Sequence, residues 1–301
     1  MKRSAALAAA ACTASLLAGC GGGGEDGKPV VVATTTQAAD ILRNVAGDRA
    51  EVRGLLAPNS DPHEYEVRPG DVKALAEAEL VVRSGGDLDE WLLGAVDSAG
   101  TDAPLLTLLE VAGAEGDDPH WWQDPRRAVR AVRAAGDALA EADPAGAVGY
   151  RSRAAAYADR LRALDAAVER CIAGLPEGQR KLVTTHDALG YYARRYGLEV
   201  IGTVIPSLST QAQPSSGDLA ELGDTIRRER VRAIFAESSV SAKVEDAIAQ
   251  ETGATVGRPL WADALGPAGS SGATYVDSIR ANTAAIVEGL SGGVRRCSLP
   301  R

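Results

Sequence analysis

The feature of this sequence that most restricts its fold is a long helical seam near the middle of the chain. Between Val148 and Ile172 apolar residues recur at alternating spacings of four and three: Tyr150, Ala154, Tyr157, Leu161, Leu164, Val168 and Cys171. This periodicity places them on one side of a single helix. At 1.5 Å per residue the helix is roughly 37 Å long, more than one small domain needs. We interpret it as a strut between two halves, with a coiled-coil partner helix as the alternative.

Strand and helix patterns alternate on both sides of this seam. Before it, the expected strands are 30–34, 51–56, 80–84 and 105–109, and the expected helices are 38–45, 69–78 and 87–96. After it, the expected strands are 181–185, 198–204, 231–236 and 254–256, and the expected helices are 187–196, 214–228, 244–251 and 275–290. The alternation predicts an α/β fold of two βα lobes with mostly parallel sheets. We expect an N-terminal lobe at 29–146, a linking helix at 147–174 and a C-terminal lobe at 175–301.

The chain contains only three histidines, and their surroundings favour metal binding. His63 and His120 each follow Asp-Pro, and His186 stands between Thr185 and Asp187. Proline restricts the preceding residue and its own φ, so the next imidazole projects from a stiff backbone, and a nearby carboxylate can accept the second ring N–H. Ligands of open α/β sheets bind beyond the carboxyl ends of strands, where the histidines are expected. A metal site is therefore favoured over ordinary core or surface histidines.

The N-terminus carries the pattern of an exported lipoprotein. A basic start precedes an alanine-rich apolar run that is too short for a stop-transfer helix, and Leu17-Ala18-Gly19-Cys20 resembles a bacterial lipobox. We expect residues 1–19 to be the signal peptide, Cys20 to be lipidated, and residues 20–28 to form a flexible tether at the membrane surface. An ordinary cleaved signal is the alternative.

The net charge restricts the kinds of binding partner, and the cysteine content bears on the redox compartment of the protein. The net charge is −9, or −11 once the two basic residues of the signal are removed, which argues against nucleic acid and suits a cation. Of four cysteines, Cys12 leaves with the signal and Cys20 would be acylated. Cys171 and Cys297 remain, and an even pair in an exported protein is a disulfide candidate. The alternative is one buried cysteine packed as a small hydrophobe and one free thiol.

Several short motifs also occur in a specific order. They are Asp61-Pro62-His63-Glu64-Tyr65, Asp118-Pro119-His120-Trp121, Thr184-Thr185-His186-Asp187-Ala188, Gln213-Pro214-Ser215, Phe235-Ala236-Glu237-Ser238 and Asp263. With them the whole chain resembles the zinc- and manganese-binding lipoproteins of bacterial ABC importers, the metal-binding adhesin family of solute-binding proteins. The resemblance implies two lobes joined by one long helix, with the metal site in the cleft between them. It implies four ligands: His63 and His120 from the first lobe, His186 and Asp263 from the second.

The implied ligand set favours zinc. Three nitrogens and one carboxylate suit a closed four-coordinate zinc site, and zinc outcompetes manganese where nitrogen ligands dominate. Manganese-binding members of the family often have a carboxylate where His186 stands. We therefore expect a monomeric extracytoplasmic protein that delivers zinc to an ABC permease, with manganese as the alternative. Only residues 113–118 replace the histidine-rich loop of many zinc-importing members, so an accessory metallochaperone is a candidate partner.

Two acidic residues are candidates to orient the metal-binding imidazoles by accepting a hydrogen bond from the ring nitrogen that faces away from the metal. Asp187 and Glu237 can each accept a ring N–H, although each can instead serve a neighbouring helix N-terminus. The competing class is a zinc hydrolase with an open three-histidine site and Glu64 or Glu66 as base. Ligation by Asp263 argues against that enzyme, and an adhesion module without metal leaves the histidines unexplained.

Overall fold

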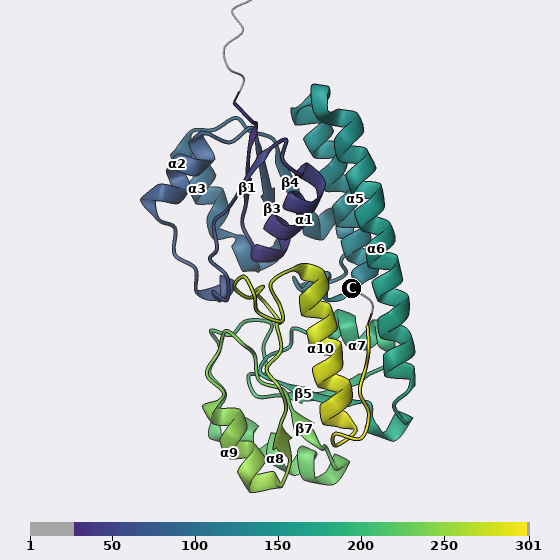
Figure 1. The fold of residues 1–301 in the computed structure, drawn as a ribbon. Coiled ribbons are helices and arrows are strands. Elements are labelled where there is room, and N and C mark those ends of the chain that lie inside the picture. The colour runs from purple at the N-terminus through teal and green to yellow at the C-terminus, as the bar shows by residue number, and fades with distance from the viewer. Residues whose placement is uncertain (1–26, 300–301) are drawn as a thin grey trace, which may run out of the picture.

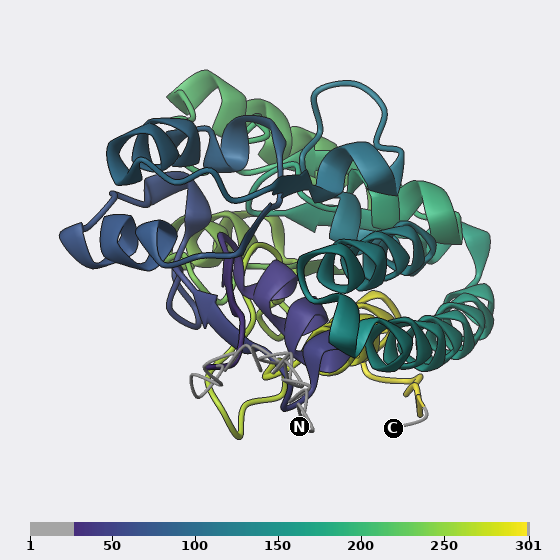
Figure 2. The same ribbon diagram turned by 90° about the horizontal axis from the view of Figure 1, so that it is seen from above.

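The computed structural model describes residues 27–299, so the expected signal peptide, Cys20 and most of the tether lie outside the described part. Figure 1 shows two α/β lobes stacked end to end, with long helices running beside them. In the perpendicular view of Figure 2 these helices lie at one side of the molecule. Within residues 27–299 no helix is both long and apolar enough to cross a membrane.

The first lobe is built on a four-stranded parallel sheet in the order β2-β1-β3-β4. Its strands are β1 (Val30–Ala33), β2 (Glu51–Gly54), β3 (Leu80–Arg83) and β4 (Leu105–Thr107). Its helices are α1 (Thr36–Ala46), α2 (Pro69–Ala76), α3 (Trp91–Ala99) and α4 (Leu108–Ala112). The central strands β1 and β3 are apolar and buried because helices cover both faces of the sheet, α1 on one and α2 with α3 on the other.

The second lobe has shorter parallel ladders. Its strands are β5 (Lys181–Thr184), β6 (Glu199–Thr203), β7 (Ala233–Ile234) and β8 (Thr255–Val256). β5 pairs with β6 and β7 with β8, and a single bridge between Thr184 and Phe235 connects the two pairs. Its helices are α7 (Gly190–Tyr196), α8 (Ser216–Glu229), α9 (Lys243–Thr252) and α10 (Tyr275–Leu290). The lobe therefore follows the predicted alternation with shorter strands.

The helix expected at 187–196 begins three residues late, at Gly190. Thr184 Oγ1 and Ala188 N both donate to His186 O, at 2.9 Å each. These local bonds hold residues 185–188 in a turn at the end of β5 and keep Asp187 out of the helix. The delay leaves His186 on an irregular segment that can point toward the other lobe.

The long helix α6 (Ala147–Ala173) runs beside both lobes, as its seam predicts. Sequence reasoning missed a second helix, α5 (Pro125–Ala142), which pairs with α6 in a hairpin. Gly136 allows their close approach, because a Cβ there would lie 2.7 Å from Ala154 Cβ. The predicted two-lobe fold with a long connecting helix is confirmed. On one side α6 also has a partner helix, α5, as the alternative interpretation proposed. Near the C-terminal end of α6 a disulfide links Cys171 to Cys297, with Cα atoms 5.8 Å apart.

Candidate metal centre

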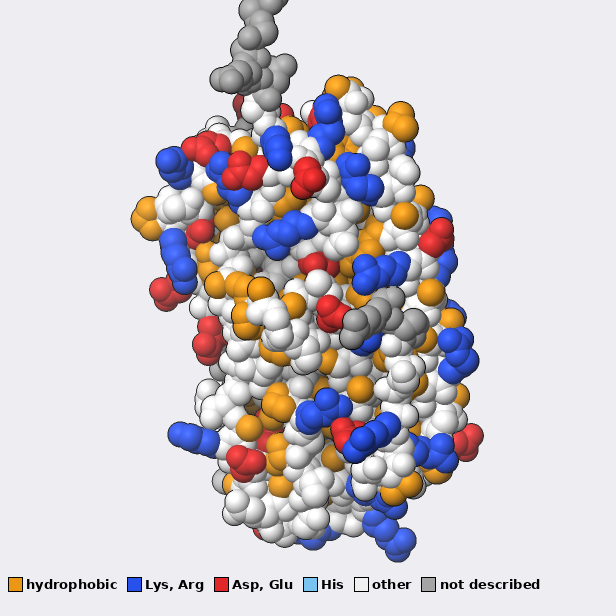
Figure 3. Space-filling model, in the orientation of Figure 1, with side chains coloured by type: hydrophobic (Ala, Val, Ile, Leu, Met, Phe, Trp, Pro, Cys, Tyr) orange, Lys and Arg blue, Asp and Glu red, His pale blue; other side chains and the backbone are white. Residues whose placement is uncertain are grey.

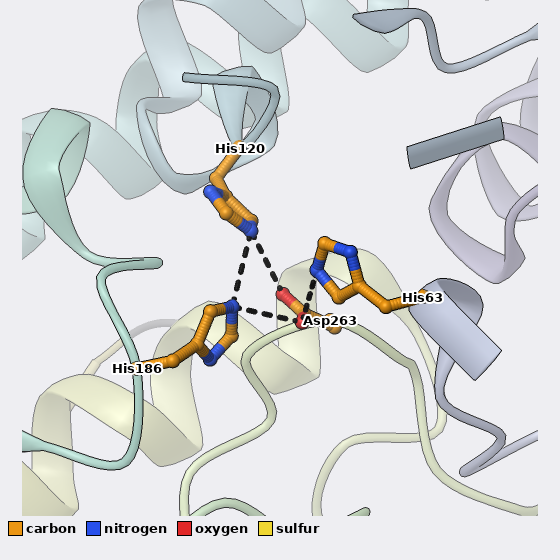
Figure 4. A group of neighbouring side chains, drawn as sticks. All are labelled: His63, His120, His186 and Asp263. Atoms are coloured by element: carbon orange, nitrogen blue, oxygen red, sulfur yellow. Dashed lines mark hydrogen bonds and ion pairs between the residues drawn. The ribbon is translucent and has the colours of Figure 1, made fainter. Parts of the chain in front are cut away.

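Four side chains from four separate segments converge where the lobes meet (Figure 4). His63 lies in a 3₁₀ turn (Pro62–Glu64), His120 precedes another (Trp121–Gln123), His186 follows β5, and Asp263 lies in the loop after β8. One nitrogen or oxygen atom from each lies within 4.8 Å of the others. His120, His186 and Asp263 are at most 1% exposed. On the face drawn in Figure 3 no histidine side chain is visible.

The spacing of the facing atoms matches that around a small metal ion. Asp263 Oδ2 lies 3.3 Å from His63 Nε2 and 3.2 Å from His186 Nε2, and Asp263 Oδ1 lies 3.4 Å from His120 Nε2. The two Nε2 atoms of His120 and His186 are 3.3 Å apart. A tetrahedral zinc ion with bonds of about 2.0–2.1 Å keeps its ligand atoms about 3.3–3.4 Å apart. The four distances join five atoms, since both oxygens of Asp263 take part, and each is close to the ligand spacing around a four-coordinate ion.

Two carboxylates behind the rings fix which nitrogen faces the centre. His120 Nδ1 lies 2.8 Å from Asp118 Oδ1, and His186 Nδ1 lies 2.5 Å from Glu237 Oε1. A carboxylate only accepts, so each Nδ1 carries a proton and Nε2 faces the centre. Facing lone pairs repel, so a proton or a metal cation has to lie between them.

The structure brings Glu237, and not Asp187, to the ring of His186. Glu237 is 4% exposed at the end of the segment that continues β7, while the backbone N–H of Asp187 donates to Ser207 O at 3.0 Å. No side-chain hydrogen bond of Asp187 occurs within residues 27–299. Asp187 lies in the turn at 185–188, and Glu237 instead takes the position beside Nδ1 of His186. Asp118 is the supporting carboxylate that sequence reasoning did not single out, although the Asp-Pro-His motif contains it.

The position of Asp263 is set by bonds to the loop that carries it. Ala262 O accepts a hydrogen bond from Trp122 Nε1 at 2.9 Å, which ties this loop to the first lobe. Asn282 of α10 accepts from the backbone N–H of Trp261 and donates to its carbonyl, each at 2.8 Å. Both oxygens of Asp263 are buried, yet neither has a hydrogen-bond partner of good geometry among the described residues. Buried orphan carboxylate oxygens are what a cation site requires.

His63 is the outlying member of the four. Its side chain is 6% exposed, and its ring centroid lies 5.9 Å from that of His120 and 5.5 Å from that of His186, which are 5.1 Å from each other. Asp61 Oδ1 accepts from His63 N at 2.9 Å, and Thr210 of the second lobe donates to Asp61 Oδ2 at 2.7 Å. The buried Nε2 of His63 has no hydrogen-bond partner in the described chain. It is thus free to bind a cation.

The electrostatics of the centre favour a positive charge. Burial lowers the pKa of His186, but the charges of Asp263 and Glu237 outweigh burial and raise that pKa well above its usual value. Burial raises the pKa of Asp263, but the charges of His186 and His120 outweigh it and hold that pKa well below its usual value. Burial keeps the pKa of Glu237 above its ordinary value. The site therefore holds an ionised carboxylate that requires a cation beside it.

Two lobes joined by a long helix, with three imidazoles and one carboxylate buried between them, define a metal-binding solute-binding protein. Comparison with known proteins agrees. The chain belongs to the family described as "ZnuA: Zinc-uptake complex component A periplasmic", whose model matches residues 31–289.

Relatives within this family are named for different metals. The manganese-binding lipoprotein MntA of Halalkalibacterium halodurans is 30% identical over 257 residues, covering 84% of this chain and 85% of the relative. The zinc-binding protein TroA of Treponema pallidum is 35% identical over 267 residues, covering 84% and 86%. A solved structure of the periplasmic zinc-binding protein TroA from Treponema pallidum aligns with a TM-score of 0.82 at 32% identity, covering 88% of this chain and 99% of that one.

These comparisons settle the class of function. The chain is the metal-binding substrate-binding protein of an ABC transporter, and the family consists of solute-binding proteins rather than enzymes. The hydrolase interpretation is therefore set aside. In the structure Asp263 lies in one group with the three histidines.

Proposed function

We propose that this protein binds one zinc ion between its lobes and delivers it to an ABC import permease. The ligands are His63, His120, His186 and Asp263. The observation that carries the proposal is the set of four contacts of 3.2–3.4 Å among their facing atoms, each close to the ligand spacing around a tetrahedral zinc ion. One group of this composition occurs within residues 27–299, which supports one ion per chain.

Manganese is the second candidate because of the carboxylate geometry. The two oxygens of Asp263 face different rings, Oδ1 toward His120 and Oδ2 toward His186. Bidentate binding by Asp263 would give five donor atoms and a larger oxygen share, which manganese prefers. Three imidazole ligands and tetrahedral edge lengths support zinc more strongly.

The remaining parts of the proposal concern organisation and location. We assign residues 29–146 and 175–301 to the two metal-binding lobes and residues 147–174 to the linking helix. We assign residues 1–19 to a signal peptide and residues 20–28 to a tether, with lipidated Cys20 anchoring a monomer on the extracytoplasmic side of the membrane. The lipobox-like motif supports this, and so does the word lipoprotein in the names of relatives. An accessory metallochaperone and an adhesion role remain proposals from the family resemblance alone.

Metal analysis and competition against a chromophoric chelator test this function. The mature protein should bind one zinc ion per chain more tightly than manganese, and Asp263→Asn should weaken zinc binding. Asp40→Asn is the matched control, since Asp40 is also a buried aspartate, accepts hydrogen bonds from Tyr157 and Tyr275, and lies outside the four ligands. Two or more tightly held ions per chain would refute the single site. Tighter binding of manganese would overturn the choice of metal and leave the transport role.

A further inference from the structure

The two inner histidines are supported in different ways. The ring of His186 is held by Glu237, and both belong to the second lobe. The ring of His120 is held by Asp118, whose Oδ1 also accepts the backbone N–H of His120 at 3.0 Å. Asp118 belongs to the first lobe, yet the helix α7 of the second lobe packs against it. The support of His120 therefore depends on how the two lobes sit together.

The hydroxyl of Tyr191 makes this connection. Tyr191 lies in α7 and is 2% exposed. Its oxygen accepts a hydrogen bond from Glu115 N at 3.0 Å, and its proton faces Glu115 O at 3.1 Å and Asp118 O at 3.3 Å. One hydroxyl thus holds both ends of the segment 115–118. This segment precedes His120 and contains the carboxylate that orients its ring.

A glycine next to Tyr191 permits the close approach. A Cβ on Gly190, the first residue of α7, would lie 3.1 Å from Asp118 Oδ2. The guanidinium of Arg194, one turn further along α7, lies 3.7 Å from the same oxygen. Oδ1 of Asp118 thus serves the histidine while Oδ2 faces the second lobe. Gly190 and Arg194 thus face the carboxylate behind His120, and Tyr191 holds the backbone of the same residue.

We propose that Tyr191 is a positioning residue for metal binding, which acts through Asp118 to fix the ring of His120 when the lobes are together. The inference rests on the proposed metal-binding function and adds a link between lobe arrangement and ligand geometry. Replacing carboxylate partners of metal-binding histidines weakens metal affinity by roughly 10–100-fold. Tyr191 acts one step further out, so its loss should weaken zinc binding by roughly fivefold.

The experiment compares two neighbouring tyrosines in the full mature protein. Tyr191→Phe removes the hydroxyl that contacts the segment 115–118. Tyr192→Phe removes a hydroxyl that is about as buried but lies 2.8 Å from Thr283 Oγ1 and makes no hydrogen bond to that segment. Zinc affinity is measured by chelator competition and stability by thermal unfolding of the metal-free protein. Tyr191→Phe should lose roughly fivefold in zinc affinity, while Tyr192→Phe should stay within about twofold of the unsubstituted protein. Equal affinities of the two variants would overturn the proposal.

A double-mutant cycle tests whether Tyr191 acts on His120 through Asp118. If Tyr191 acts through Asp118, adding Tyr191→Phe to Asp118→Ala should cause no further loss of zinc affinity. The Co²⁺ absorption spectrum should change in Tyr191→Phe and not in Tyr192→Phe, because it reports the geometry of the ligands rather than stability. A full fivefold loss in the Asp118→Ala background would overturn the route. If the unsubstituted protein bound neither zinc nor manganese, the proposed function itself would fail, an outcome distinct from equal affinities of the two variants.

Discussion

Zinc affinity should fall as the pH is lowered from 8 to 6, because binding must expel a proton from His186. In the metal-free protein, the charges of Asp263 and Glu237 overcome the effect of burial and raise the pKa of His186 well above its usual value. The ring therefore holds its proton to higher pH than an ordinary histidine does, and zinc competes with that proton. Sequence considerations alone place the loss of affinity below about pH 6, near the ordinary range of histidine. The structure moves the start of the loss to higher pH.

The size of the effect follows from counting protons. While one proton is displaced, affinity changes about tenfold per pH unit, or about 1.4 kcal/mol. A fall of two pH units within the range where His186 is protonated should therefore weaken zinc binding about a hundredfold. Each further ring that takes up a proton adds another factor of about ten per pH unit.

Calorimetric titration with zinc at pH 7, in buffers of different ionisation enthalpy, counts the protons released. Release of about one proton or more is expected. Glu237→Gln is the control, because it removes one of the charges that raise the pKa of His186 while keeping a side-chain oxygen beside Nδ1. That variant should release fewer protons at pH 7. Zinc binding without proton release in the unsubstituted protein would refute the reasoning.

Other substitutions test the site, the disulfide and the packing of α6. His120→Ala should weaken zinc binding roughly a hundredfold and leave the circular dichroism unchanged, since His120 lies in a loop; unchanged affinity would remove it from the site. Thiol titration of the denatured, unreduced mature protein, with the lipid-attachment cysteine replaced, should find neither Cys171 nor Cys297 free, and two free thiols would contradict the disulfide. Its sequence separation of 126 residues corresponds to a stabilisation of up to about 4.7 kcal/mol, which reduction should remove from the free energy of unfolding. Arg195→Ala should lower that free energy by up to about 3 kcal/mol, because Arg195 holds the buried Asp165 at 2.7 and 2.8 Å; no change in chemical denaturation would show that this pair is dispensable.

The sequence predicted the long helix and the alternation of strands and helices because both depend on local periodicity. The seam from Tyr150 to Val168 is buried as its spacing required, and α10 begins and ends where the pattern placed it. The four residues that meet at the centre were named from short motifs and a family resemblance. No periodicity brings His63 and Asp263 together, so their contact could come only from the resemblance or from the structure.

The helix α5 was missed although its start is marked by a strong signal. Asp124 accepts a hydrogen bond from Arg126 N at 2.8 Å, and Pro125 occupies the first helical position. Four of the nine buried residues of α5 are alanine, whereas the buried face of α6 includes two tyrosines and two leucines.

The supporting carboxylates show a different limit of the sequence. Asp187 and Glu237 were equal candidates, because each lies beside a strand end and adjacency in sequence cannot report direction. Glu237 reaches Nδ1 of His186 from a different strand, 51 residues away. Which acid lies behind a ring depends on the path of the backbone at the end of β5, and that path is set by tertiary contacts.

The division of ligands between lobes has a consequence for release of the ion. If the lobes separate, His63 and His120 leave together, and the second lobe keeps only His186 and Asp263, too few ligands to hold zinc tightly. Release would then need only movement of the lobes. A cross-link between them should slow it, and the contact of Asn59 Nδ2 with Ser238 O at 3.1 Å offers a place to introduce paired cysteines. Oxidation of that pair should slow zinc transfer to a chelator relative to the reduced form, and equal rates would show that the ion leaves without separation of the lobes.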